Sequence, residues 1–231
     1  MTREELDAIL NKMLHEITII NTNWVMWKGL RDALQEGSEY NKLLEYSPCF
    51  WTITLNNLLS KALLGTAKLY DENKKCMGLQ KIINICEQNQ KLFSKSRTTT
   101  YTDGYTGEKT SFTVSKDISE SIRISKQKYQ DIHNFRTQLI TLRDKYLAHA
   151  DKDIFLDIEA FYNEVALKKD ALEKLIETAE NILNSFLADL SDTRVYTEFE
   201  NSDDYKNLLR YAKEGKEAVL QRIRSKTNNK T

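Results

Sequence analysis

Hydrophobic side chains recur every three or four residues along most of the chain, and this spacing is the period of an amphipathic α-helix. Thr2 and Glu5 have the spacing of a capping box at the start of the first helical stretch. Ser47 and Pro48 begin the second stretch, which is apolar on nearly every side and is expected at the centre of a bundle. The pattern predicts helices over residues 2–34, 48–70, 79–93, 118–148, 171–190 and 203–224.

Residues 97–115 have a different pattern. Thr98 to Thr102 and Phe112 to Val114 are rich in residue types that favour strands, and Asp103-Gly104 is a typical hairpin turn. We predict that this segment is a β-hairpin or a loop inserted between two helices.

The composition supports a helical fold, because the 231 residues include only seven Gly and one Pro. Sheet proteins need frequent turns, which use these two residue types. We therefore predict an all-α helical bundle with a short β-hairpin or loop insertion near 97–115. Residues 1–190 are expected to form the bundle, 191–202 a linker, and 203–225 a basic helix packed on the same domain.

The charge of the chain is balanced overall, with 34 basic and 34 acidic residues, but it is unevenly distributed. Residues 151–204 carry fifteen Asp or Glu and five Lys or Arg, whereas residues 206–231 carry eight Lys or Arg and two Glu. Three interpretations stay open: the acidic stretch docks on the basic one, the basic helix contacts nucleic acid, or both are solvated helix faces.

The cysteines and the hydropathy indicate the compartment. Cys49, Cys76 and Cys86 form no CxxC pair and are odd in number, which fits a reducing environment. The first ten residues are acidic and amphipathic, unlike a signal peptide. No apolar run approaches the roughly 18 residues of a membrane span. We expect a cytoplasmic protein without membrane contact.

Most familiar catalytic motifs are missing from the sequence. It contains no P-loop, GxGxxG, HExxH or GxSxG motif, and its three His and three Cys have no metal-ligand spacing. We therefore expect neither a metal nor another cofactor.

One polar cluster has catalytic potential: Arg143, Asp144, Lys145 and His149, within the sequence LRDKYLAHAD. Arginine can hold a phosphate through two parallel hydrogen bonds and keeps its charge near neutrality. Histidine can take or give a proton near pH 7. Together, the two side chains suffice for attack of an RNA 2′-hydroxyl on its own 3′-phosphate.

The spacing of Arg143 and His149 limits how they can act together. Six residues of a regular helix correspond to about 9 Å of rise and about 240° of rotation, so the two side chains flank an apolar stripe. A two-fold axis through this stripe in a homodimer, or a helix distortion near Ala148, would bring them together. The spacing alone is better explained by a structural arginine and a histidine at a helix C-terminus.

The decapeptide resembles the HEPN superfamily (higher eukaryotes and prokaryotes nucleotide-binding), and more narrowly its abortive-infection AbiU-type branch, whose members carry Arg-Asp/Asn-Lys-x-x-Ala-His. The stretch Ala67 to Asp71 also resembles that branch. The resemblance covers roughly residues 1–190 and implies a compact helical bundle that dimerises with the Arg–His motifs facing each other. Asp151 stands where members silenced by adenylylation carry a tyrosine, so this regulation is not expected.

The resemblance implies a role for each residue of the motif. Arg143 would contact the scissile phosphate, and His149 would act as general base or acid. Asp144 would orient this pair, and Lys145 would supply charge to the RNA backbone.

The function implied is that of a metal-independent endoribonuclease that leaves 2′,3′-cyclic phosphate ends and acts in antiphage defence or toxin–antitoxin growth arrest. RNA is the expected substrate, a homodimer the expected assembly, and an antitoxin or an activating partner a further candidate. The alternative is a non-catalytic helical module that binds RNA, nucleotide or a protein partner. A nuclease needs both Arg143 and His149, whereas a binding module should tolerate the loss of His149.

Overall fold

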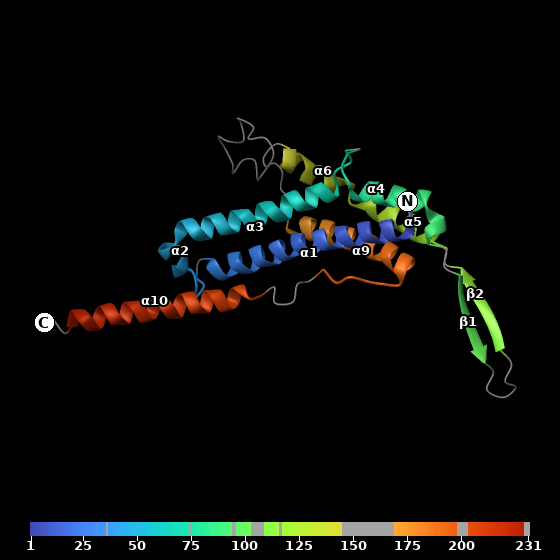
Figure 1. Ribbon diagram of the computed structural model, residues 1–231. Coiled ribbons are helices and arrows are strands. Elements are labelled where there is room, and N and C mark those ends of the chain that lie inside the picture. Colours follow the sequence, from blue (N-terminus) through green and yellow to red (C-terminus); the bar gives the residue numbers. More distant parts are fainter. Residues whose placement is uncertain are drawn as a thin grey trace. The chain divides into compact units, whose positions relative to one another are not determined.

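The computed structural model describes residues 1–35, 37–73, 75–93, 96–102, 109–115, 117–144, 169–197 and 203–228 (Figure 1). Within these ranges the chain forms α-helices, one short 3₁₀ turn (Gln90–Leu92) and one two-stranded sheet. The elements are α1 (Arg3–Leu34), α2 (Lys42–Tyr46), α3 (Pro48–Leu69), α4 (Leu79–Gln88), β1 (Ser96–Thr102), β2 (Lys109–Ser115), α5 (Ser119–Asp131), α6 (His133–Leu142), α9 (Lys169–Ser191) and α10 (Tyr205–Asn228). The predicted all-α fold is confirmed.

The first helices begin where the sequence predicts, for local reasons. At the start of α1 the backbone N–H of Thr2 donates to Glu5 Oε2 at 2.7 Å. In return, the N–H of Glu5 donates to Thr2 Oγ1 at 3.2 Å, which completes the capping box. α3 begins at Pro48, whose fixed φ suits the first turn of a helix.

The hairpin prediction is also confirmed. β1 and β2 pair antiparallel, from Ser96 opposite Ser115 to Thr102 opposite Lys109. The predicted turn at Asp103-Gly104 lies outside the described residues.

The single helix predicted over 118–148 is divided in two. α5 ends at Asp131 and α6 begins at His133, and Ile132 between them has φ −97° and ψ 13°. Ile132, Leu139 and Leu142 are buried, whereas Phe135 is 37% exposed. Residues 145–148 of the predicted helix lie outside the described residues.

The chain divides into two compact units: unit 1 comprises Met1–Ile17 and Leu63–Thr197, and unit 2 comprises Thr18–Ala62 and Glu198–Thr231. Of the three boundaries between the units, one falls inside α1, one inside α3, and one between α9 and α10. The division predicted at 1–190, 191–202 and 203–225 stays a prediction.

The core of unit 1 is built around α9. This helix contacts α5 and α6, and α5 in turn contacts α4. The Tyr70 hydroxyl, at the end of α3, donates to the carbonyl oxygen of Leu175 on α9 at 2.6 Å. Because both residues are buried, this bond fixes the end of α3 beside α9. The buried side chains of α9 are Ala171, Leu172, Leu175, Ile176, Thr178, Ala179, Ile182, Leu183, Phe186, Leu187 and Leu190.

The core of unit 2 holds α10 against the second half of α1. Its buried members are Leu30, Leu34, Leu43, Trp51 and Leu209. A Cβ at Gly29 would overlap the ring of Tyr205, so this glycine lets the first turn of α10 approach α1 closely.

The expected central position of α3 is wrong for the first half of this helix. Phe50 and Ile53 are 55% and 54% exposed. Only one side of this half, which includes Trp51, packs into the core of unit 2. None of the helices in the described ranges combines the length and apolar character needed to cross a bilayer.

Candidate functional site

A polar pocket of about 370 Å³ opens in unit 1 where α3 ends. Two segments line it: the turn Tyr70–Asn73 after α3, and α6 with the residue that follows it. The lining residues are Tyr70, Asp71, Glu72, Asn73, His133, Arg136, Thr137, Ile140, Thr141 and Arg143. Two acidic side chains and two arginines therefore face the same space.

The turn after α3 fixes where its acidic residues lie. The Oδ1 atom of Asp71 accepts a hydrogen bond from the backbone N–H of Asn73 at 2.9 Å, which is an Asx turn. A Cβ at Gly78 would overlap the carbonyl oxygen of Asp71. Because this glycine directly precedes α4, the close approach holds the backbone of Asp71 against the start of that helix.

Arg143 follows α6 and lies between two carboxylates. Its Nη1 donates to Asp71 Oδ2 at 2.8 Å, and its Nε donates to Asp144 Oδ1 at 2.7 Å. The side chains of Arg143 and Asp71 are 21% and 23% exposed. These bonds use two of the five N–H groups of the guanidinium. The arginine is therefore held in place and faces the pocket.

The backbone stays helical through Arg143, directly after the last residue of α6, Leu142. Arg143 has φ −58° and ψ −52°, and its backbone N–H donates to the carbonyl oxygens of Leu139 and Ile140. The helix distortion that the sequence suggests near Ala148 lies outside the described residues.

A second arginine reaches the same pocket from the first turn of α6. The Nη1 atom of Arg136 donates to Glu72 Oε1 at 2.6 Å, and its guanidinium lies 3.8 Å from the ring centre of Tyr129. The Tyr129 hydroxyl also donates to Glu72 Oε1, at 3.1 Å. The Arg136 side chain is only 8% exposed, and its buried Nε has no hydrogen-bond acceptor among the described residues. His133 Nδ1 lies 3.4 Å from the Nη2 atom of Arg136.

These pairings shift the ionisation of the pocket. The backbone N–H of Asn73, together with Arg143, lowers the pKa of Asp71, although burial opposes this shift. The Arg136 hydrogen bond lowers the pKa of Glu72 in the same way. Asp144 and then Asp71 raise the pKa of Arg143. Burial raises the pKa of Tyr129, which keeps its hydroxyl protonated as a donor to Glu72. At neutral pH Asp71, Glu72 and Arg143 are thus all charged.

The structure describes two of the four residues predicted for the site. Arg143 lines the pocket, and Asp144 accepts a hydrogen bond from its Nε atom; the roles predicted for both residues stay predictions. Lys145 and His149 lie outside the described residues, so their roles stay predictions.

Sequence analysis misses the carboxylate partners and the second arginine. Asp71 belongs to the stretch that carries the resemblance, but the sequence assigns it no contact with Arg143. The one local signal for Arg136 is its distance of seven residues from Arg143, about two helical turns, which places both on one helix face. Glu72 gives no signal beyond its position next to Asp71.

Comparison with known families now adds to this geometry. A family model described as AbiU2, of the HEPN type, matches residues 3–208. The chain belongs to the AbiU2 family. No curated protein and no solved structure matches it. The match covers both stretches that carry the predicted resemblance, and these stretches meet through the Arg143–Asp71 pair.

The chemistry available in this AbiU2-family pocket is that of anion binding. A guanidinium presents donors in a planar fork that matches the oxygens of a phosphate. The two carboxylates that Arg143 contacts hold its guanidinium in place. The described residues include no group of three or more His, Cys, Asp or Glu that would hold a metal ion.

Proposed function

We propose that this AbiU2-family protein is a metal-independent endoribonuclease of HEPN type that acts in the cytoplasm in antiphage defence or toxin–antitoxin growth arrest. The observation that carries the proposal is the pair between Arg143 and Asp71, 2.8 Å apart in a polar pocket. It joins the two stretches of sequence that resemble the AbiU branch, and it gives the arginine of the predicted catalytic motif a fixed direction.

In the proposed mechanism, Arg143 binds the non-bridging oxygens of the scissile phosphate and stabilises the charge that develops in the transition state. His149 takes the proton of the RNA 2′-hydroxyl, whose oxygen attacks the phosphorus as the bond from phosphorus to the 5′-oxygen breaks, and the leaving 5′-oxygen takes up a proton from solvent. The products are a 2′,3′-cyclic phosphate and a 5′-hydroxyl. Asp144 orients Arg143, and Lys145 contacts the RNA backbone. DNA lacks the nucleophile and is not cut.

We further propose that the enzyme is a homodimer in which the two motifs share one cleft. On a regular helix Arg143 and His149 would point in different directions. A second copy would supply the missing partner across a two-fold axis. An antitoxin or an activating partner would then control this cleft.

The test is incubation of the purified full-length protein with total RNA in EDTA, followed by mapping of the cleaved ends. The proposal expects cuts that carry 2′,3′-cyclic phosphates in the parent, and a loss of at least about 10²-fold in His149→Ala, the usual scale for a lost general acid–base group. His15→Ala, an exposed histidine on α1, is the matched control and should cut as the parent does.

A binding assay on the same proteins distinguishes the alternative of a non-catalytic binding module. For such a module, the parent would bind labelled RNA, nucleotide or a protein partner without cutting RNA. His149→Ala would also bind as the parent does. Equal cleavage by the parent and by a folded His149→Ala variant would contradict the assignment of the site.

A further inference from the structure

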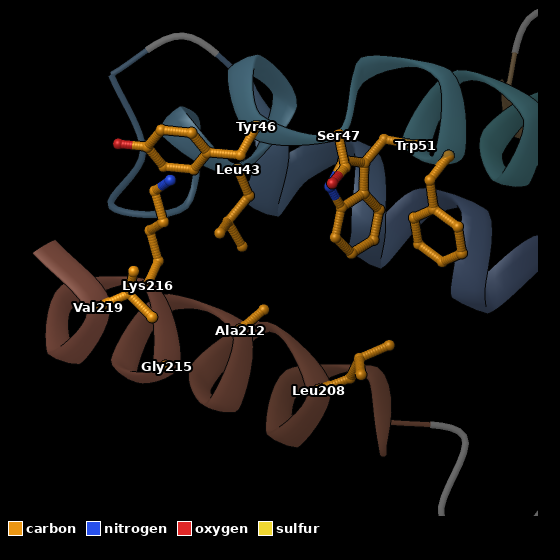
Figure 2. Close-up of a pocket in the computed structure, with 10 residues that line it drawn as sticks. Leu43, Tyr46, Ser47, Trp51, Leu208, Ala212, Gly215, Lys216 and Val219 are labelled. Carbon is orange, nitrogen blue, oxygen red and sulfur yellow. The ribbon is translucent and has the colours of Figure 1, made fainter.

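Unit 2 contains a groove of about 500 Å³ that is separate in character from the polar pocket. It lies between α10 on one side and α2 with the first turns of α3 on the other (Figure 2). Figure 2 shows Leu208 and Ala212 extending from α10 toward Leu43 and Trp51 on the opposite side. Except for Ser47 and Lys216, its lining side chains are apolar or aromatic.

Large apolar side chains at the groove are unusually exposed. Leu208 and Val219 on α10 are 53% and 48% exposed, and Phe50 on α3 is 55% exposed. A contiguous exposed patch of this kind marks an interaction surface more often than isolated apolar residues do.

The positions on α10 that face the groove follow the spacing of a helix–helix seam. Leu208, Ala212, Gly215 and Val219 are separated by four, three and four residues. This is the interval at which one helix presents a continuous face to another helix. Eleven residues span about 16 Å of helix, enough to receive about three turns of a partner helix.

Gly215 is an independent sign that something approaches this face. Glycine in a helix interior costs roughly 1 kcal/mol relative to alanine. A Cβ at Gly215 would meet nothing within 4 Å, so the contacts inside unit 2 do not require a glycine there. The lack of a side chain instead leaves room for the backbone of a partner at the middle of the groove.

The charge around the groove indicates which kind of helix would bind there. Helix α10 carries seven Lys or Arg and two Glu. The one charged residue that lines the groove is Lys216, whose Nζ lies 4.0 Å from the ring centre of Tyr46. Two copies of α10 facing each other would bring like charges together. A helix with apolar side chains on one face and carboxylates beside them would complement the surface.

We propose that this groove binds an acidic amphipathic helix of a partner protein. The apolar face of that helix packs between α10 and the α2–α3 corner, with its closest approach at Gly215. Its flanking carboxylates lie beside Lys216 and the other basic residues of α10. This partner site is independent of the RNase chemistry assigned to unit 1.

The probe for the test is a fluorescein-labelled three-heptad peptide with Leu at positions a and d and Glu at positions e and g. We expect it to bind the full-length protein with micromolar affinity in fluorescence anisotropy at physiological salt. Gly215→Leu fills the groove without removing a contact, and it should weaken binding by at least about tenfold. A peptide with Lys in place of every Glu should bind at least about tenfold more weakly.

Ile124→Glu provides the matched surface control, because Ile124 is exposed on α5 in unit 1. It should bind the acidic peptide as the parent does. Circular dichroism checks that Gly215→Leu is folded, which is expected because leucine is a better helix former than glycine.

Three results would overturn the proposal. The acidic peptide fails to bind at tens of micromolar, or binds Gly215→Leu as tightly as the parent, or binds no better than its Lys counterpart. Two further results would assign the groove to a different occupant and would also overturn the proposal. One is a dimer in sedimentation that Gly215→Leu dissociates, and the other is single-stranded RNA that binds the parent, displaces the peptide and no longer binds Gly215→Leu.

Discussion

The pocket of unit 1 and the groove of unit 2 are built from opposite kinds of side chain. In the pocket, Arg143 and Arg136 each contact a carboxylate, at 2.8 Å and 2.6 Å. In the groove, exposed Leu, Val and Phe side chains surround a single lysine. The pocket is thus lined by side chains in directional charged hydrogen bonds, whereas the groove is lined by apolar surface.

The pocket and the groove should therefore recognise different features of a ligand. Charged hydrogen bonds have preferred lengths and directions, so the pocket selects a ligand by the geometry of its polar groups. Apolar surface has no such direction, so the groove selects by shape and by the charge at its rim. Substitutions should therefore have large and specific effects in the pocket and small effects on stability in the groove.

The largest expected effect is on catalysis. Arg143→Ala should lower RNA cleavage by at least about 10²-fold, because it removes the group that stabilises the transition state. Arg143→Lys should also be strongly impaired, since an ammonium cannot form the two parallel bonds of a guanidinium. Initial rates on a labelled RNA measure both effects.

Arg123→Ala is the control for this prediction. Arg123 is exposed on α5, where it pairs with Glu120, and its removal should leave the rate unchanged. If Arg143→Ala were folded and cut RNA as fast as Arg123→Ala, the pocket would not be the site of the chemistry.

The next effect combines stability and positioning. Gly78→Ala should destabilise the protein by about 1–3 kcal/mol, the usual cost of overpacking, because the new methyl group meets the backbone of Asp71. Gly215→Ala is the opposite case, since open space surrounds it. It should stabilise α10 by up to about 1 kcal/mol. Thermal unfolding of both variants measures the contrast, and equal shifts would argue against a tight contact at Gly78.

Loss of the Arg136 partner should have an intermediate effect. Glu72→Gln leaves the buried guanidinium with a weaker acceptor, and we expect a loss of about 1–2 kcal/mol. This loss of stability lies between the costs of breaking a buried and an exposed ion pair, because Arg136 is buried whereas Glu72 is exposed to water. For a chain of this size, the unfolding temperature should fall by roughly 2–4 °C per kcal/mol.

Glu87→Gln is the matched control, because the pair of Glu87 with Lys126 is exposed on both sides. It should cost less than about 1 kcal/mol. An equal loss in both variants would show that the burial of Arg136 adds nothing to its pair.

The acid dependence of stability should be smaller but distinct. The folded-state pKa values of Asp71 and Glu72 are lowered below their ordinary values of about 3.9 and about 4.3. Folding therefore favours their ionised forms, and the resulting stability is fully present above the ordinary pKa values. It is lost as the pH falls through the folded-state values.

The double variant Asp71→Asn/Glu72→Gln isolates this contribution. It should be less stable than the parent at pH 7, and its unfolding temperature should fall less steeply between about pH 5 and about pH 3. Parallel curves for the two proteins over this range would show that the pocket carboxylates do not carry the acid sensitivity.

The smallest expected effect belongs to the groove. Lys216→Gln removes the ammonium group from the ring of Tyr46 and should cost no more than about 1 kcal/mol, the upper value for an exposed cation–π contact. Thermal unfolding should thus change by only a few degrees. A loss as large as that of Glu72→Gln would mean that the groove is part of the structural framework.

The sequence predicts much of the candidate site but not the contacts that fix it. Arg143, which the sequence singles out, lines the pocket, and Asp144 accepts a hydrogen bond from it. Their helix is predicted as continuous, however, because the spacing of apolar residues around Ile132 gives no sign of the break there. A single residue with non-helical backbone angles separates the two helices without changing which positions are apolar.

By itself, the sequence determined the all-α fold, the hairpin, the capping box at Thr2 and the basic character of α10. These features depend on neighbours a few residues apart, whose spacing follows directly from helix and strand geometry. Only the tertiary structure decided that Asp71 contacts Arg143, 72 residues later, and that Glu72 contacts Arg136, 64 residues later. Such pairs form where packed helices bring distant side chains within hydrogen-bond distance. The spacing of apolar residues along the sequence does not specify which helices pack together.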